Sequence, residues 1–188
     1  MLVHPIATVP IYLMRAALTE ITKIHWSDSQ QDLVRKNSKI FSSSSSLALR
    51  IHDAPEGTWT VEQYGEFVKC RDTALRAQFP CMNLLVLWII KILHGKHLGR
   101  IQLVRLEGKG DVQLHIDPGT YFQVHRRYHV PLITNDKTIF FSTHEEARME
   151  VGVLCELNNR ELHGVRNESD NPRVHLIVDL QTEDYSWK

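Results

Sequence analysis

The second half of the sequence breaks into short runs in which apolar and polar residues alternate, and this pattern restricts the fold more than any other feature. Turn-forming residues separate most of the runs, for example at Pro118-Gly119 and Asn158-Asn159. Many short strands at this spacing are typical of an all-β barrel or a double-sheet jelly roll. The expected strands are Arg100–Leu106, Asp111–Asp117, Arg127–Thr134, Thr138–Ser142, Val151–Leu157, Glu161–Arg166 and Arg173–Leu180.

The first hundred residues carry mostly helical patterns. Thr60 and Gln63 have the spacing of a capping box, which marks the start of a helix. The expected elements are a helical segment Arg15–Ile24, a strand Ser44–Ile51, a helix Val61–Ala77 and a helix Met82–Leu93.

The chain has 188 residues, which is the size of one ordinary domain with its own core. We therefore predict a single, mainly β domain over residues 1–188. In it, residues 1–99 supply N-terminal strands and buttressing helices, and residues 100–182 form the jelly-roll core.

Composition excludes several classes of protein. Lysine plus arginine and aspartate plus glutamate both number 22, so the basic excess that phosphate-backbone binding needs is missing, and no nucleic-acid partner is expected. The three cysteines are scattered without a CxxC pair, which argues against a disulfide scaffold and favours a reducing, cytoplasmic location. The apolar stretch Leu2–Met14 contains His4, Pro5 and Pro10 and lacks a basic leader, so it is a poor signal peptide. The stretch Cys81–Ile90 is too short for a membrane span of about 20 residues, so no transmembrane helix and no membrane partner are expected.

A metal site is indicated by the segment Asp111–Asp117. On an alternating strand, Val112, Leu114 and Ile116 would share the apolar face. His115 and Asp117 would then point together to the opposite face and could grip one ion. A distant histidine would complete a 2-His-1-carboxylate triad, the arrangement of non-haem iron sites.

His163 is the best third ligand because it lies 48 residues after His115 on another expected strand. Without the rest of the pattern, His163 would be interpreted as an ordinary strand histidine. Arg173 follows ten residues later across a turn, so a hairpin would bring it beside His163. An inward arginine needs an anion, and its guanidinium matches a carboxylate with two hydrogen bonds. The alternative partner for Arg173 is a structural salt bridge to Asp179.

Arg127 and His129 lie two residues apart and share one face of their strand. Both could donate to a bound dicarboxylate, although a cross-strand charge pair would explain Arg127 equally well. Three further histidines, His125, His144 and His175, are expected to have structural or surface roles.

Taken in order, these pieces resemble the aspartyl/asparaginyl β-hydroxylases and their proline-hydroxylating relatives. The resemblance covers about residues 100–182. It rests on His115-Ile-Asp-Pro-Gly119, Arg127-Tyr-His-Val-Pro-Leu132, Gly152-Val-Leu-Cys-Glu-Leu-Asn-Asn159, and the segment from His163-Gly-Val-Arg-Asn to Arg173-Val-His-Leu-Ile-Val-Asp179.

The resemblance implies a double-stranded β-helix that binds Fe(II) and uses 2-oxoglutarate and O2. Carried over residue by residue, His115, Asp117 and His163 would bind the iron. Arg173 would pair with a 2-oxoglutarate carboxylate, with Arg127 and His129 contacting the same co-substrate. The metal performs the difficult step in such enzymes, so no catalytic side chain is assigned beyond the metal centre.

The leading hypothesis is therefore an Fe(II)- and 2-oxoglutarate-dependent hydroxylase of an amino-acid side chain of the Asp, Asn or Pro type. The substrate would be free or part of a peptide or protein. Two alternatives stay open: a non-catalytic jelly-roll module that binds a metal or carboxylate, and a cupin-type metalloenzyme that does not use 2-oxoglutarate. Arg173 favours the first hypothesis, because neither alternative requires a carboxylate anchor at that position.

Overall fold

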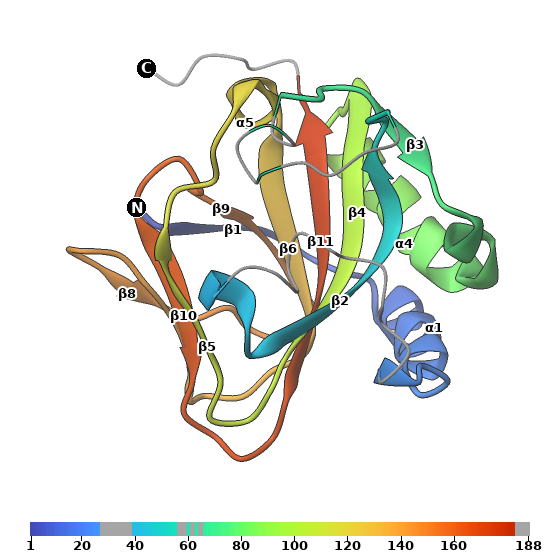
Figure 1. The fold of residues 1–188 in the computed structure, drawn as a ribbon. Coiled ribbons are helices and arrows are strands. Elements are labelled where there is room, and N and C mark those ends of the chain that lie inside the picture. Colours follow the sequence, from blue (N-terminus) through green and yellow to red (C-terminus); the bar gives the residue numbers. More distant parts are fainter. Residues whose placement is uncertain (27–38, 56–59, 61–62, 64–65, 183–188) are drawn as a thin grey trace.

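Two antiparallel β-sheets form the protein in the computed structural model, which describes residues 1–26, 39–55, 60, 63 and 66–182. Figure 1 shows the smaller sheet on the side of the larger one that faces away from helices α1 and α4. The larger sheet has the order β1 (Val3–Thr8), β9 (Val153–Leu157), β6 (Arg126–Ile133), β11 (Arg173–Gln181), β4 (His97–Leu106), β2 (Ser44–His52) and β3 (Cys70–Asp72). The smaller sheet has the order β5 (Asp111–His115), β10 (His163–Asn167), β7 (Thr138–Phe141) and β8 (Glu146–Ala147).

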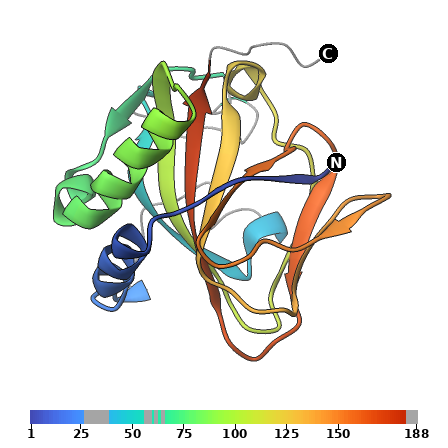
Figure 2. The same ribbon diagram turned by 180° about the vertical axis from the view of Figure 1, so that it is seen from behind.

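Helices α1 (Ile11–Ile21) and α4 (Pro80–Ile92) cover the outer face of the larger sheet, as Figure 2 shows from behind. The buried face of β11 that meets them is apolar and alternates as expected. Its residues Val174, Leu176, Val178 and Leu180 belong to one hydrophobic cluster with residues of both helices. The opposite face of β11 is thereby directed toward the smaller sheet.

A buried carboxylate joins the two helices. Glu20, near the end of α1, is only 7% exposed and accepts hydrogen bonds from the backbone N–H groups of Cys81 and Met82 at 2.7 and 2.8 Å. These are donors of the first turn of α4 that have no partner within the helix. A carboxylate at the N-terminus of α4 also interacts favourably with the positive end of the helix dipole. Glu20 therefore fixes where α4 begins relative to α1.

The predicted mainly β jelly roll with flanking helices is confirmed, and each expected strand has a counterpart within a few residues. Short elements were missed: strands β1, β3 and β8, and helices η2 (Lys39–Phe41) and α5 (Thr120–Val124). Within the described residues, β1 to β3 join the same sheet as the later strands β4, β6, β9 and β11.

The predicted helix Val61–Ala77 is wrong over its second half. The capping box does form, because Gln63 and Thr60 exchange side-chain hydrogen bonds with each other's backbone at 3.0 and 3.2 Å. Residues 61–62 and 64–65 lie outside the described residues. Cys70–Asp72 instead becomes β3, paired with β2, and a 3-10 helix, η3 (Ala74–Gln78), follows. Pairing with a neighbouring strand has outweighed the helical spacing of the apolar residues.

The expected helix Met82–Leu93 is confirmed as α4. The expected helical segment Arg15–Ile24 is displaced toward the N-terminus, because α1 begins at Ile11. No helix in the described part of the chain is long and apolar enough to cross a membrane.

Candidate metal centre and its pocket

His115, Asp117 and His163 converge at the edge of the smaller sheet. One potential ligand atom from each residue lies within 4.8 Å of the others, and all three residues are partly or fully buried. His115 and His163 are paired neighbours on β5 and β10, with ring centroids 4.3 Å apart. Oδ1 of Asp117 lies 3.6 Å from Nε2 of His115. The three residues selected from the sequence therefore form one cluster.

The strand β5 reaches this arrangement through an irregularity. His163 pairs with His115, but the next pair, Val165 with Val112, is shifted by one residue. Two residues of β5 thus lie opposite Gly164, which is the arrangement of a β-bulge. A Cβ atom at Gly164 would stand only 2.8 Å from the carbonyl oxygen of Val112, so the close approach requires glycine here.

The bulge corrects the prediction of simple alternation along Asp111–Asp117. Leu114 and Ile116 were expected on the buried apolar face with Val112, but they are 43% and 50% exposed. Strand β5 also ends at His115, so Asp117 lies beyond it. Asp117 reaches the site because its backbone N–H donates to the carbonyl of Asn159 at 3.2 Å.

Both histidines are held in the form that binds a metal. Nδ1 of His115 lies 2.8 Å from the carbonyl oxygen of Gln113, and Nδ1 of His163 lies 2.9 Å from that of Glu161. A carbonyl only accepts, so each Nδ1 must carry a proton, and in the neutral ring Nε2 is then the nitrogen with a free lone pair. Such backbone partners are typical of histidines that ligate metals. Two bare imidazole nitrogens and one carboxylate are the donor set that suits Fe(II).

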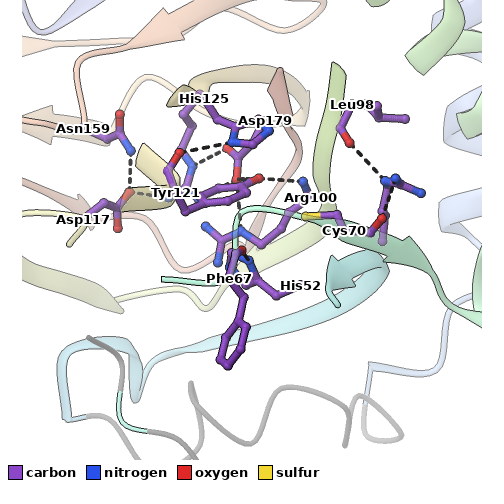
Figure 3. A network of polar contacts seen from close by, with 12 residues as sticks. His52, Phe67, Cys70, Leu98, Arg100, Asp117, Tyr121, His125, Asn159 and Asp179 are labelled. Atoms are coloured by element: carbon purple, nitrogen blue, oxygen red, sulfur yellow. Dashed lines mark hydrogen bonds and ion pairs between the residues drawn. The ribbon is translucent and has the colours of Figure 1, made fainter. Parts of the chain in front are cut away.

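The carboxylate of Asp117 is oriented by two donors on the same oxygen. Nδ2 of Asn159 donates to Oδ2 at 2.8 Å, a contact visible in Figure 3, and Nη1 of Arg127 donates to Oδ2 at 2.5 Å. Oδ1 is then the oxygen turned toward His115. Burial alone would raise the pKa of Asp117, but the Arg127 guanidinium holds it well below its usual value. Asp117 is therefore an anion, ready to bind a cation.

Behind Arg127 lies a buried charge network, part of which Figure 3 shows. The carboxylate of Asp179 accepts from Nε and Nη2 of Arg127 at 2.9 and 3.0 Å, and from Nε of Arg100 at 3.1 Å. The hydroxyl of Tyr121 donates to the same carboxylate at 3.1 Å. Burial raises the pKa of Asp179, but the two guanidinium groups outweigh it, so the pKa is below the usual value. The network thus connects the orientation of Asp117 to the packing of β4, β6, β11 and α5.

A cavity of about 430 Å³, counting its opening to solvent, adjoins the cluster of His115, Asp117 and His163. Its walls come from both sheets, with His115 and His163 on one side and Arg127, His129 and Arg173 on the other. Arg173 is only 3% exposed, and its guanidinium lies over the ring of Phe140 at 5.6 Å. A positive charge is therefore buried within the same cavity as His115 and His163.

The route by which Arg173 reaches the cavity differs from the expected hairpin. His163 lies on β10 in the smaller sheet and Arg173 on β11 in the larger sheet, so the two strands are not paired. The turn between them crosses from one sheet to the other, and the two residues face the cavity from different sheets. Asp179, the alternative partner considered for Arg173, binds Arg127 and Arg100 instead.

His129, which lines the cavity, contacts His175 on the neighbouring strand β11. Their Nδ1 atoms are 3.3 Å apart, and both side chains are fully buried. Burial and the nearby charge of Arg173 lower the pKa of both histidines well below the usual value, so both rings are neutral. Alternation on β11 places His175 on the face of Arg173, yet nothing in the sequence indicated that it would contact His129.

Sequence reasoning missed several residues that support the site. Asn159 ends the segment Gly152–Asn159, but the sequence indicated no role for it. Its position just after β9 brings its side chain beside Asp117. Arg100 and Tyr121 contact Asp179 from β4 and α5, and no local spacing indicates this contact.

Replacing Asn159 by alanine is expected to weaken metal binding by about 10–100-fold, which is the usual effect of losing a residue that orients a ligand. The mutation removes one of the two donors on Oδ2 of Asp117. Titration with Mn(II) monitored by calorimetry measures the effect. The neighbouring Asn158→Ala is the control. The backbone N–H of Asn158 donates to the carbonyl of Leu2, and the mutation leaves this hydrogen bond in place. Equal affinities in the two variants would show that Asn159 does not orient Asp117.

Comparison with known proteins agrees with this geometry. The model of the aspartyl/asparaginyl β-hydroxylase family matches residues 27–183. No curated protein matches the sequence.

Three solved structures share the fold. A prolyl hydroxylase from Trichoplax adhaerens, in complex with a peptide fragment of the oxygen degradation domain of hypoxia inducible factor, superimposes with a TM-score of 0.63 at 10% identity, covering 97% of this chain and 84% of that one. A 2OG-Fe(II) oxygenase family oxidoreductase from Burkholderia pseudomallei gives 0.53 at 14% identity, covering 73% and 67%. A prolyl-4-hydroxylase from Pseudomonas putida gives 0.50 at 13% identity, covering 96% and 91%.

At these identities the superpositions establish the fold alone, whereas the family match spans most of the sequence. The chain therefore belongs to the aspartyl/asparaginyl β-hydroxylase family, and it is a hydroxylating dioxygenase of the Fe(II)- and 2-oxoglutarate-dependent type.

Proposed function

We propose that the enzyme hydroxylates an amino-acid side chain of the Asp, Asn or Pro type, with Fe(II) bound by His115, Asp117 and His163. The observation that carries the proposal is the cluster itself, in which two bare Nε2 atoms and one ionised carboxylate face one another. A facial set of three protein ligands leaves positions on the metal for a chelating co-substrate and for O2. When bound, the iron supplies the oxidising chemistry, with O2 as oxidant and 2-oxoglutarate as reductant.

Arg173 is proposed to bind a carboxylate of 2-oxoglutarate. It is a buried cation in the cavity next to the metal cluster, and a guanidinium pairs with a carboxylate through two parallel hydrogen bonds. The side chain of His129 lies in the same wall and would add a further donor. Because charge pairing in a buried cavity is weakly screened, Arg173 would attract a dianionic co-substrate strongly.

Arg127 was also assigned to the co-substrate, and it does line the cavity. Its Nε and Nη2 donate to Asp179, and its Nη1 donates to Asp117. We therefore propose that Arg127 acts mainly by orienting the carboxylate ligand Asp117, and that any contact with the co-substrate is secondary to this role.

The proposed substrate is an amino acid within a peptide or a free amino acid. The family name and the peptide bound to the Trichoplax prolyl hydroxylase support this class of substrate. The charge balance of the chain, 22 basic and 22 acidic residues, favours neither a nucleic acid nor an anionic surface as partner.

Replacing Arg173 by alanine is expected to raise the KM for 2-oxoglutarate by about 10–100-fold, which corresponds to the loss of a charge-assisted hydrogen-bond pair. Succinate formation by the purified protein with Fe(II), 2-oxoglutarate, ascorbate and air measures this effect. Single amino acids and short peptides containing Asp, Asn or Pro are then added to identify the class that stimulates turnover.

The matched control is Arg148→Ala, which removes an exposed arginine whose Nε donates to the backbone of Asp136, away from the cavity. It should leave turnover unchanged. Metal binding by Arg173→Ala should also be unchanged, because Arg173 is not a ligand. A wild-type protein that binds Mn(II) and forms no succinate with any of these compounds would contradict the proposed function.

A further inference from the structure

The pair of histidines behind the proposed co-substrate site contains an unusual hydrogen bond. His129 on β6 and His175 on β11 approach each other through their Nδ1 atoms at 3.3 Å. The Nε2 atom of each ring is buried and has no hydrogen-bond partner within the described part of the chain. The ring of Phe140 packs against both, stacked on His175 at 5.8 Å and edge-on to His129 at 5.8 Å. The two rings are therefore braced in one relative orientation.

The hydrogen bond between the two Nδ1 atoms restricts where the ring protons of His129 and His175 can lie. Each neutral imidazole carries one proton, and a hydrogen bond between two Nδ1 atoms needs a proton on one of them only. The ring that donates through Nδ1 has a bare Nε2, and the ring that accepts has a protonated Nε2. The pair can thus exist in two forms, which differ in whether the Nε2 atom of His129 donates or accepts.

Only His129 of the two lines the cavity. Its Nδ1 is turned to His175, so Nε2 is the nitrogen left for a ligand. A carboxylate in the cavity needs a donor, and a bare Nε2 would repel it. The form suited to an anionic ligand therefore has Nε2–H on His129 and Nδ1–H on His175.

We propose that His175 is a positioning residue that sets the tautomer of His129, so that Nε2–H of His129 is aimed at a carboxylate of the co-substrate. The inference rests on the proposed function, because it assumes that 2-oxoglutarate occupies this cavity. His175 is fully buried and was expected to have a structural or surface role, so this proposal gives it a function.

Nitrogen-15 NMR of the imidazole rings tests the tautomers directly in the wild-type protein. The protein is loaded with diamagnetic Zn(II), and spectra are recorded before and after addition of 2-oxoglutarate. With 2-oxoglutarate bound, His129 should be protonated on Nε2 and bare on Nδ1, and His175 should show the reverse. His129 protonated on Nδ1 in that complex would overturn the inference while leaving the proposed function intact.

Two substitutions at His175 separate hydrogen bonding from packing. His175→Asn places an amide nitrogen near the position of Nδ1 and keeps a donor to His129, whereas His175→Phe keeps a ring but has no donor. The dissociation constant of 2-oxoglutarate, measured by calorimetry on the Mn(II)-loaded protein, should rise about tenfold in His175→Phe and change less than about twofold in His175→Asn. Mn(II) affinity should be the same in both variants, which shows that the metal centre has folded.

Equal losses in both variants would mean that His175 acts through packing alone, and equal wild-type affinity in both would mean that it has no role at the site. Either result overturns the inference. His144→Phe, at an exposed histidine, controls for the substitution itself. A wild-type protein that binds Mn(II) but not 2-oxoglutarate would overturn the proposed function, and the inference with it.

Discussion

Replacing Asp179 by asparagine is expected to destabilise the protein by about 3–5 kcal/mol, the usual result of breaking a buried ion pair by removing one partner. The carboxylate is 1% exposed and accepts hydrogen bonds from Arg127, Arg100 and Tyr121. An asparagine side chain offers a single acceptor oxygen, and its amide group would face donors. Two guanidinium groups would then remain buried without their shared counter-charge.

The effect should depend on pH in one direction. The folded-state pKa of Asp179 is below its unfolded value of about 3.9, so the carboxylate adds stability that is fully present above about pH 4. This contribution is lost as the pH falls toward the folded-state pKa. The difference in stability between wild type and Asp179→Asn should therefore be largest near neutral pH and shrink below pH 4.

Urea unfolding at several pH values measures both effects. Asp170→Asn is the control. The side chain of Asp170 is 88% exposed and pairs with Lys109 at 3.4 Å, and such a surface ion pair adds little to the free energy of unfolding. A destabilisation of Asp179→Asn no larger than that of the control would show that the network around Arg127 is not needed for folding.

Replacing His163 by alanine is expected to weaken metal binding by more than about 100-fold and to abolish succinate formation. Removing a residue that only orients a ligand already weakens metal affinity by about 10–100-fold, and this change deletes one of the three proposed ligands themselves. The site would keep one histidine and one carboxylate, too few to hold the metal at working concentrations. Calorimetry with Mn(II) and the succinate assay give the two readouts.

The matched control for this variant is His144→Ala, at a histidine exposed to solvent. It should bind metal and turn over 2-oxoglutarate like the wild type. Unchanged metal affinity in His163→Ala would mean that the metal is held elsewhere.

The sequence predicted which residues form the candidate site better than it predicted the strand geometry that brings them together. His115, Asp117 and His163 do cluster, but the expected alternation along the strand is interrupted by the bulge opposite Gly164. A bulge depends on the partner strand, here on a glycine 49 residues beyond His115, so the local pattern could not reveal it.

Asp179 illustrates the same limit for charge pairs. It was considered as a partner for Arg173, but residues six apart on one strand are about 20 Å apart. Its actual partners are Arg127 on β6 and Arg100 on β4. These two strands are the neighbours of β11 in the larger sheet. Strand order in the sheet decides such pairs, and alternation within one strand carries no information about that order.

The alternation of apolar and polar residues predicted side-chain orientation correctly on β11, where one face is apolar and the other carries polar residues. On β11, the apolar side chains meet the helices, while Arg173 and His175 lie on the other face. Helical spacing of apolar residues was misleading at Cys70–Asp72, which pairs with β2 as strand β3. Pairing across the sheet is a tertiary interaction that spacing along the chain does not encode.

Joint binding of Fe(II) and 2-oxoglutarate at the proposed site can be tested by an anaerobic titration of the Fe(II)-loaded protein with 2-oxoglutarate, monitored by visible absorption. A 2-oxoacid that chelates Fe(II) through its carboxylate and keto oxygens produces a charge-transfer band. We expect this band in the wild type, its absence in His163→Ala, and its appearance only at higher 2-oxoglutarate concentrations in Arg173→Ala. A wild-type protein that binds Fe(II) but shows no such band at saturating 2-oxoglutarate would contradict this expectation.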